Sequence, residues 1–197
     1  MRATLDKLIS WMGLLLAIVL LVAGGLLVWA NSFIGTQVDQ QLSDQQITMP
    51  TEEAIDGDEA LSEEDREALR PHAGSPMNTG AEARAYADHY ILAHMNASTG
   101  GETYSSLGGV VREACADPES DACAEANAMR DTAFKGSTLR GLLLYGYAFA
   151  TMGTIAGYAS VGAFIAAAIL LVLAALGFAH SRKVEETAPK VGSPASA

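Results

Sequence analysis

Apolar residues are concentrated in two long runs near the ends of the chain, and polar residues fill the segment between them. No charged residue occurs from Leu8 to Val38, and none occurs from Gly141 to Ala179. Each run exceeds the roughly 20 apolar residues that a helix needs to cross about 30 Å of hydrocarbon. The pattern predicts two transmembrane helices, which we place at residues 8–30 and 156–179.

The first apolar run has the features of an uncleaved signal anchor. The stretch Leu8–Ala30 is longer than the core of a signal peptide, and Trp29 is too bulky for a cleavage site. Trp11 and Trp29 are separated by about 27 Å of helical rise. This spacing predicts that the two indoles are interface anchors, one at each surface of a lipid bilayer.

Basic residues near the chain ends predict the orientation. They are Arg2, Lys7, Arg182, Lys183 and Lys190. Positive flanks stay in the cytoplasm, so we expect residues 1–7 and a disordered tail at 180–197 to be cytoplasmic. A hairpin of two short helices within 141–179 would place Arg182 outside, and a single crossing is therefore preferred.

The middle of the chain is acidic and is expected outside the cytoplasm. From Asn31 to Arg140 there are 20 acidic and 7 basic residues. This charge excludes binding to a phosphate backbone as a function class. It either keeps an exported domain soluble or attracts cations and basic partners. We interpret residues 31–78 as a flexible acidic linker with one short helix near 63–70, which a capping box at Ser62 and Asp65 would start.

A helical domain is predicted at residues 79–140. Thr79 and Glu82 form a capping box for a helix over 80–97, and Gly100-Gly101 supplies the positive φ angles that end it. Tyr86, Tyr90 and His94 recur every four residues and are expected to share one face of this helix.

The histidines do not form a recognisable metal motif. His89 and His94 are five residues apart, about 140° around an α-helix, and are expected to face different ways. No second cluster of ligands accompanies them. We predict no metal, cofactor or catalytic residue, and a packed, hydrogen-bonded role for His94.

Cys115 and Cys123 are the only cysteines and lie in the segment expected outside the membrane. In an oxidising compartment such a pair is expected to form a disulfide, with a redox-active pair as the alternative. Pro118 suits the first position of a helix, and a helix of about 60 residues is predicted from there into the second crossing.

Residues 141–155 are apolar but precede the predicted second crossing. We interpret them as a membrane-approach helix that must pack on the outer domain, on the first helix or on a partner. Small residues on one face predict helix packing. They are Gly146, Ala150, Gly153 and Gly157. No predicted intramembrane residue is ionisable, which argues against a transporter or a channel.

The motif residues resemble a family of small two-span membrane proteins of actinobacteria, which often carry the label aromatic ring-opening dioxygenase LigA. The shared positions are Ile47-Thr48, Ala85-Tyr86-Ala87, Ile91, His94, Thr99-Gly100-Gly101 and Thr103-Tyr104. The label implies non-haem iron, which requires two histidines and a carboxylate around open positions. We read the label as an inherited name and predict that the chain is not an enzyme.

The sequence therefore predicts an all-α membrane protein, in which two transmembrane helices flank a small, mainly helical extracytoplasmic domain with an acidic flexible linker. The expected location is the bacterial cell membrane, with both termini cytoplasmic. We expect a non-catalytic accessory or structural component of a larger membrane assembly, with the lipid bilayer and another membrane protein as partners. The alternatives are an extracytoplasmic binding or sensing module, with Tyr86, Tyr90 and His94 as its ligand face, and the dioxygenase of the label.

Overall fold

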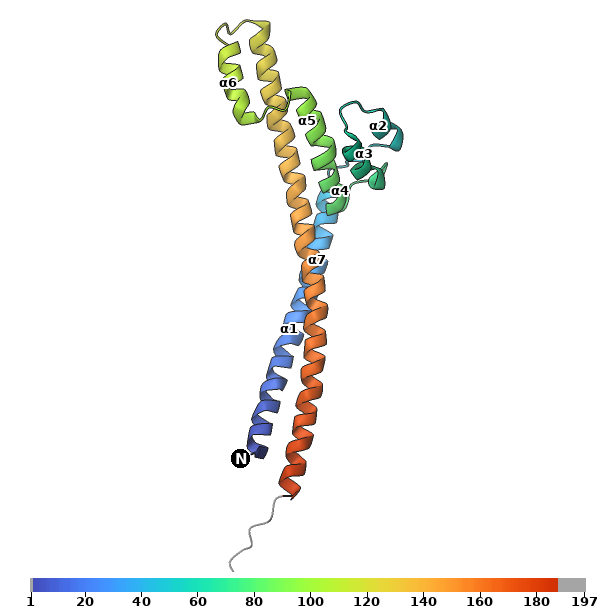
Figure 1. The fold of residues 1–197 in the computed structure, drawn as a ribbon, viewed down its shortest axis with the longest axis vertical. Helices are drawn as coiled ribbons and strands as arrows, with labels where there is room; N and C mark the ends of the chain where they lie inside the picture. Colours follow the sequence, from blue (N-terminus) through green and yellow to red (C-terminus); the bar gives the residue numbers. More distant parts are fainter. Residues whose placement is uncertain (1, 188–197) are drawn as a thin grey trace, which may run out of the picture. The chain divides into compact units, whose positions relative to one another are not determined.

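The computed structural model describes residues 2–187, and their regular structure is helical apart from one isolated bridge between Thr48 and Pro76 (Figure 1). The chain divides into two compact units. One, here called the helical pair, contains residues 2–32 and 154–187. The other, the central unit, is Phe33–Gly153. Two long helices, α1 (Arg2–Ser43) and α7 (Asp121–Thr187), each contribute to both units.

Both long helices extend beyond the predicted transmembrane segments. α1 continues past the predicted segment to Ser43, and no proline in residues 31–43 interrupts it. α7 begins at Asp121 rather than at Pro118, which lies in the preceding turn. It passes through Gly136 and Gly141 without a break and extends to Thr187. The predicted disordered tail is therefore helical at 180–187, and the rest of that tail lies outside the described residues.

Small side chains line the contact within the helical pair. In α1 the buried residues Ser10, Ala17 and Gly24 are seven residues apart, and in α7 so are Ser160, Ala167, Ala174 and Ser181. The helices are antiparallel, since Trp11 makes an edge contact with Phe178 at 5.6 Å and Gly24 lies under the ring of Phe164. We call this contact the small-residue seam. A seven-residue repeat is the period at which two helices keep one face in contact, and small residues allow close approach.

Most large apolar residues of the helical pair, Phe164 excepted, point away from the seam. Leu15, Val172 and Leu176 are 58%, 60% and 62% exposed. Both α1 and α7 are long and apolar enough to cross a membrane. An exposed apolar surface of this kind is suited to hydrocarbon, where helices satisfy their backbone hydrogen bonds internally.

The predicted flexible linker is folded. It contains α2 (Glu52–Gly57), α3 (Glu63–Leu69) and the short 3-10 helix η1 (Arg70–His72). A set of nearly inaccessible apolar side chains from this segment joins the core of the central unit. They are Met49, Ile55, Leu61, Leu69 and Met77. These residues are six or eight positions apart, too sparse to show a helical or a strand period among the acidic residues around them.

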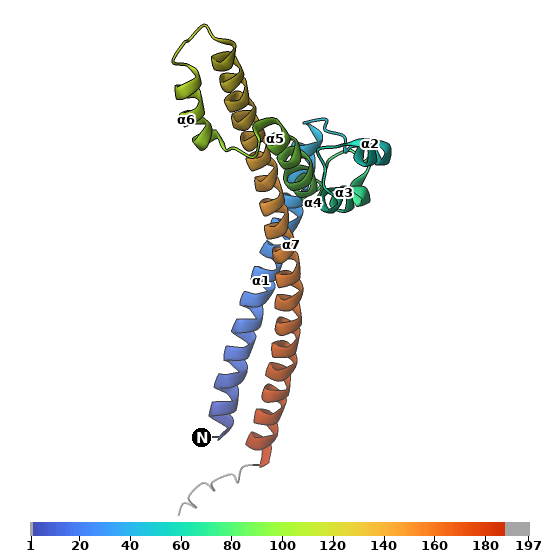
Figure 2. The same cartoon turned by 45° about the horizontal axis from the view of Figure 1, so that its top comes forward.

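A second helical stretch follows, made of α4 (Gly80–Ala85), a π-helical segment η2 (Tyr86–Ile91) and α5 (Leu92–Thr99). The capping box at Thr79 and Glu82 starts it, and Gly100 and Gly101, with φ angles of 65° and 82°, end it as predicted. α6 (Tyr104–Ala114) comes next, and α4 and α5 lie along α7 in both views (Figures 1 and 2). Cys115 and Cys123 form a disulfide between the end of α6 and the first turn of α7.

We expect the disulfide to stabilise the α6–α7 connection. Closing a loop of this length removes about 2–3 kcal/mol of chain entropy from the unfolded state. The double variant Cys115→Ser/Cys123→Ser should therefore lose hydrogen-exchange protection in α6 by a corresponding amount, while α4 and α5 keep theirs. Unchanged exchange in α6 would show that apolar packing alone fixes this helix.

Candidate functional site

The Tyr86–Tyr90–His94 ladder is a continuous stack of rings along η2 and α5. The Tyr86 and Tyr90 rings are stacked with centroids 4.8 Å apart, and the Tyr90 and His94 rings are 4.3 Å apart. The shared face predicted from their spacing is thus present. Tyr86 and Tyr90 also pack against the core of the central unit. Burial raises the pKa of the Tyr86 hydroxyl, and the neighbouring Tyr90 adds to this shift.

The π-helical segment changes the direction of the two histidines. A π-helix pairs residues five apart along the backbone, so its turn is wider than the α-helical turn assumed from the sequence. His89 Nδ1 lies 2.9 Å from Asp65 Oδ1, and His94 Nε2 lies 3.0 Å from Asp58 Oδ2. Both histidines therefore reach carboxylates of the segment 58–65. The angle of about 140° expected between them assumed an α-helix throughout and does not apply across the π-helical segment.

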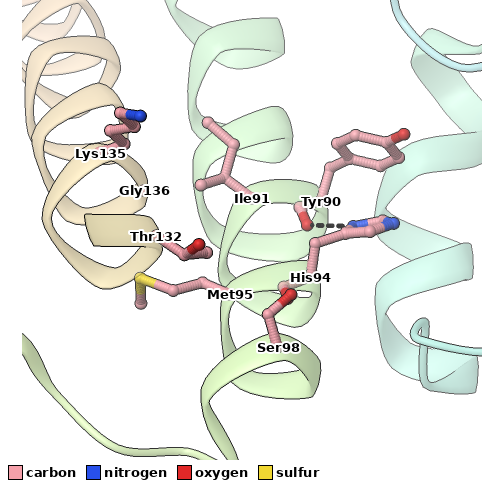
Figure 3. Close-up of a pocket in the computed structure, with 8 residues that line it drawn as sticks. All are labelled: Tyr90, Ile91, His94, Met95, Ser98, Thr132, Lys135 and Gly136. Carbon is pink, nitrogen blue, oxygen red and sulfur yellow. Dashed lines mark hydrogen bonds between the residues drawn. The ribbon is translucent and has the colours of Figure 1, made fainter. Parts of the chain in front are cut away.

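A shallow pocket of about 270 Å³ lies beside His94 (Figure 3). Its lining comes from η2, α5 and α7 and consists of Tyr90, Ile91, His94, Met95, Ser98, Thr132, Lys135 and Gly136. Some of the polar groups that line it already have partners. Lys135 is paired with Asp131 at 2.6 Å, and the Ser98 hydroxyl donates to the carbonyl of His94. No nucleophile is aligned with a base among these lining residues.

Glu82 fixes the start of the helix that carries the ladder. Its carboxylate accepts hydrogen bonds from the backbone N–H groups of Asn78 and Thr79 and from the hydroxyls of Thr79 and Ser75, at 2.9–3.0 Å. Burial alone would raise the pKa of Glu82, but these four hydrogen bonds outweigh it and lower the pKa below 4.5. The sequence predicted the capping box but not the contact with Ser75.

Charged side chains connect this helix to α7. Asp88 Oδ1 accepts a hydrogen bond of 2.8 Å from Arg140, and its other oxygen lies 3.7 Å from Arg84. Arg84 also donates to the Tyr147 hydroxyl at 3.0 Å, with its guanidinium 4.9 Å from the centre of that ring. Sequence reasoning missed this cluster, because its partners are up to 63 residues apart.

The remaining motif residues mark helix ends. Thr99 is buried and donates to the carbonyl of Met95, and Gly100 and Gly101 form the C-terminal cap of α5. Thr103 caps α6 through a reciprocal contact with Ser106. Tyr104 is half exposed beside the ring of Phe134. The positions that carry the family resemblance therefore have local structural explanations here.

The predicted small-residue face contacts more than one element. Gly146 lies against Leu42 of α1, and Gly157 lies against Asn31. Ala150 instead faces Gly80 at the start of α4, where any larger side chain would collide with it. Gly153 is buried.

An open apolar groove of about 570 Å³ lies within the central unit, between α1 and α7. No charged residue lines it. The lining is Phe33, Ile34, Gln37, Val38, Gln41, Leu42, Gln45, Leu139, Leu142, Leu143, Tyr145, Gly146, Phe149 and Met152. Several of these side chains are largely uncovered, with Leu142 61% and Tyr145 67% exposed. The groove includes much of the apolar stretch 141–155, which was expected to pack on another helix or on a partner.

The donor set for non-haem iron is not assembled among the described residues. No group of three or more histidine, cysteine, aspartate and glutamate side chains in residues 2–187 is placed to hold a metal ion. The two histidines of η2 and α5 each pair with a separate aspartate. The residues present therefore do not fit two histidines and a carboxylate on one iron.

Comparison with known proteins found no matching family model, no matching curated protein and no matching solved structure.

Replacing Glu82 should make the protein less stable and less sensitive to acid. Because the folded-state pKa is lowered, the stabilisation is complete above pH 4.5 and is lost as pH falls through the folded-state pKa. Glu82→Gln should cost about 1–2 kcal/mol at neutral pH and flatten the acid limb of the unfolding curve. The exposed Glu67→Gln is the matched control. Equal acid sensitivity in both variants would contradict the stabilising role given to the Glu82 carboxylate.

Alanine at Tyr86 tests whether the ladder is core or ligand face. We expect Tyr86→Ala to lower the free energy of unfolding by about 2–3 kcal/mol, because a partly buried ring leaves the core. Tyr104→Ala, which truncates a half-exposed ring, should cost less than about 1 kcal/mol. Thermal unfolding of the two variants measures the difference, and an unchanged melting temperature for Tyr86→Ala would favour a ligand face.

Proposed function

We propose that the protein is a non-catalytic integral membrane protein of the bacterial cell envelope, acting as an accessory or structural component of a larger membrane assembly. α1 and α7 would each cross the membrane once. Both termini would be cytoplasmic, and the acidic central unit would lie outside. The basic residues at both ends support this orientation. Membership of the two-span actinobacterial family is part of the same proposal.

The observation that carries the proposal is the uncovered apolar groove. Its lining is uncharged, and in the sequence the apolar run of α7 continues after Met152. A water-exposed face of this size is unfavourable and typically marks an interaction site. The occupant we favour is a helix that emerges from the membrane in a partner subunit, with apolar side chains against α7 and hydrogen-bonding groups against Gln37, Gln41 and Gln45.

The absence of an assembled iron site among the described residues favours a structural role over the dioxygenase label. The sensing alternative is less favoured, because the His94 ring is occupied on both nitrogens and the tyrosines of the ladder pack in the core.

Two substitutions in the groove should release the partner. The double variant Leu142→Gln/Phe149→Gln places two amides where the partner would bury apolar side chains. Burial of each apolar side chain stabilises the complex by about 1.5–3 kcal/mol. Recovery of partner subunits from native membranes in mild detergent should fall by at least about tenfold. Phe134→Gln is the matched control, because Phe134 is on the same helix and is 52% exposed against 55% for Phe149, but lies outside the groove.

The occupant is identified by a photo-crosslinking residue at Tyr145. A crosslink to one transmembrane helix of the recovered subunit supports the proposal. Crosslinks to lipid only, crosslinks to a second copy of this chain, or loss of the partner in the Phe134→Gln control as well would each overturn it.

A further inference from the structure

Both ring nitrogens of His94 face hydrogen-bond acceptors. Nδ1 lies 2.7 Å from the backbone carbonyl oxygen of Tyr90 (Figure 3), and Nε2 lies 3.0 Å from Asp58 Oδ2. A backbone carbonyl cannot donate a hydrogen bond. The other carboxylate oxygen of Asp58 accepts from the N–H of Ala60 at 3.0 Å. Asp58 thus uses one carboxylate oxygen for a backbone N–H and presents the other to His94.

A neutral imidazole cannot satisfy this arrangement, because it has one N–H and one lone pair. One of the two contacts would then place a lone pair against an acceptor oxygen. Only the imidazolium cation donates from both nitrogens. We infer that His94 is held as an imidazolium cation and acts as a proton-dependent clasp between α5 and the connection from α2 to α3.

The second histidine provides a contrast within the same helix. His89 contacts Asp65 through Nδ1, and no second acceptor faces its other nitrogen in the contacts described. Neutral His89 can donate from Nδ1 and keep this bond. The Asp65 carboxylate is also held by Ser62, through its backbone N–H and its hydroxyl. Loss of a proton therefore breaks a contact of His94 but not that of His89.

The charged groups around His94 favour the cation. Asp58 approaches from the α2–α3 connection, and Lys135 of α7 lines the same pocket with its charge offset by Asp131. Tyr90 lies against the ring on its own helix, and Asp65 is directed at His89. The His94 side chain is 40% exposed, so it exchanges protons with the surrounding water. The clasp would thus respond to the pH of the compartment that bathes the central unit.

The clasp secures a defined part of the fold. Asp58 lies three residues before the buried Leu61, and its carbonyl accepts from Arg66 at 2.8 Å. In the clasped state His94 holds a proton that it releases more readily in the open state. The clasped state therefore becomes less stable as pH rises through the range where histidines lose their charge. We expect the segment 52–72 to open locally, with the rest of the central unit intact. This inference does not depend on the proposed function.

The test uses full-length protein in detergent micelles with nitrogen-15-labelled histidine. The ring-nitrogen chemical shifts of His94 should report protonation of both nitrogens up to a higher pH than in Asp58→Asn. In that variant the side-chain amide can donate to Nε2, so neutral His94 is satisfied, and the doubly protonated ring should be lost at a lower pH than in the wild type.

Hydrogen exchange provides the second readout. Protection of the segment 52–72, corrected for intrinsic exchange, should fall by about tenfold between pH 6 and pH 8 in the wild type and in His89→Gln. It should be nearly independent of pH in His94→Gln and in Asp58→Asn. A His94 ring that is singly protonated at pH 6, or a pH dependence that persists in Asp58→Asn, would overturn the inference. The wild-type spectrum decides the question even where a variant does not fold.

Discussion

Close approach of two antiparallel helices is the constraint on which the structure depends. At the small-residue seam the contact positions recur every seven residues and hold only serine, alanine or glycine. Large side chains there would separate the helices, and side chains such as Phe164 could no longer cover Gly24. The large apolar residues are consequently directed outward, where they give both helices the composition of membrane-spanning segments.

The central unit is held by polar contacts at the edge of a small apolar core. Glu82 joins the start of α4 to the loop before it, and Asp88 joins η2 to α7. The core itself is assembled from residues spread between Leu42 and Ala87, together with Leu143 of α7. Buried hydrogen bonds to a charged group stabilise more than neutral ones, so a few acidic residues have structural roles within a strongly acidic segment.

Local signals in the sequence predicted local structure well. The capping residues Ser62 and Thr79 and the glycine pair at 100–101 act over a few neighbouring residues, and each has the expected result. The two uncharged runs lie in long apolar helices, as expected. Features that depend on distant partners were not predictable in the same way. The Asp88–Arg140 pair and the core around Met49 and Met77 have no periodic signature. Composition alone suggested a flexible linker where irregularly spaced apolar residues form a core.

The π-helical segment has a consequence for how the chain tolerates changes in length. A π turn contains one residue more than an α turn needs, so deleting one residue between Tyr86 and Ile91 could be absorbed by conversion to regular α-helix. Because the i→i+5 turn of a π-helix takes the place of an i→i+4 turn of an α-helix, the residues after it would keep nearly the same direction relative to α4. His94 would still face Asp58, and the capping residues at both ends of the helix would keep their places. The segment between Tyr86 and Ile91 is thus a place where this helix tolerates a one-residue difference in chain length.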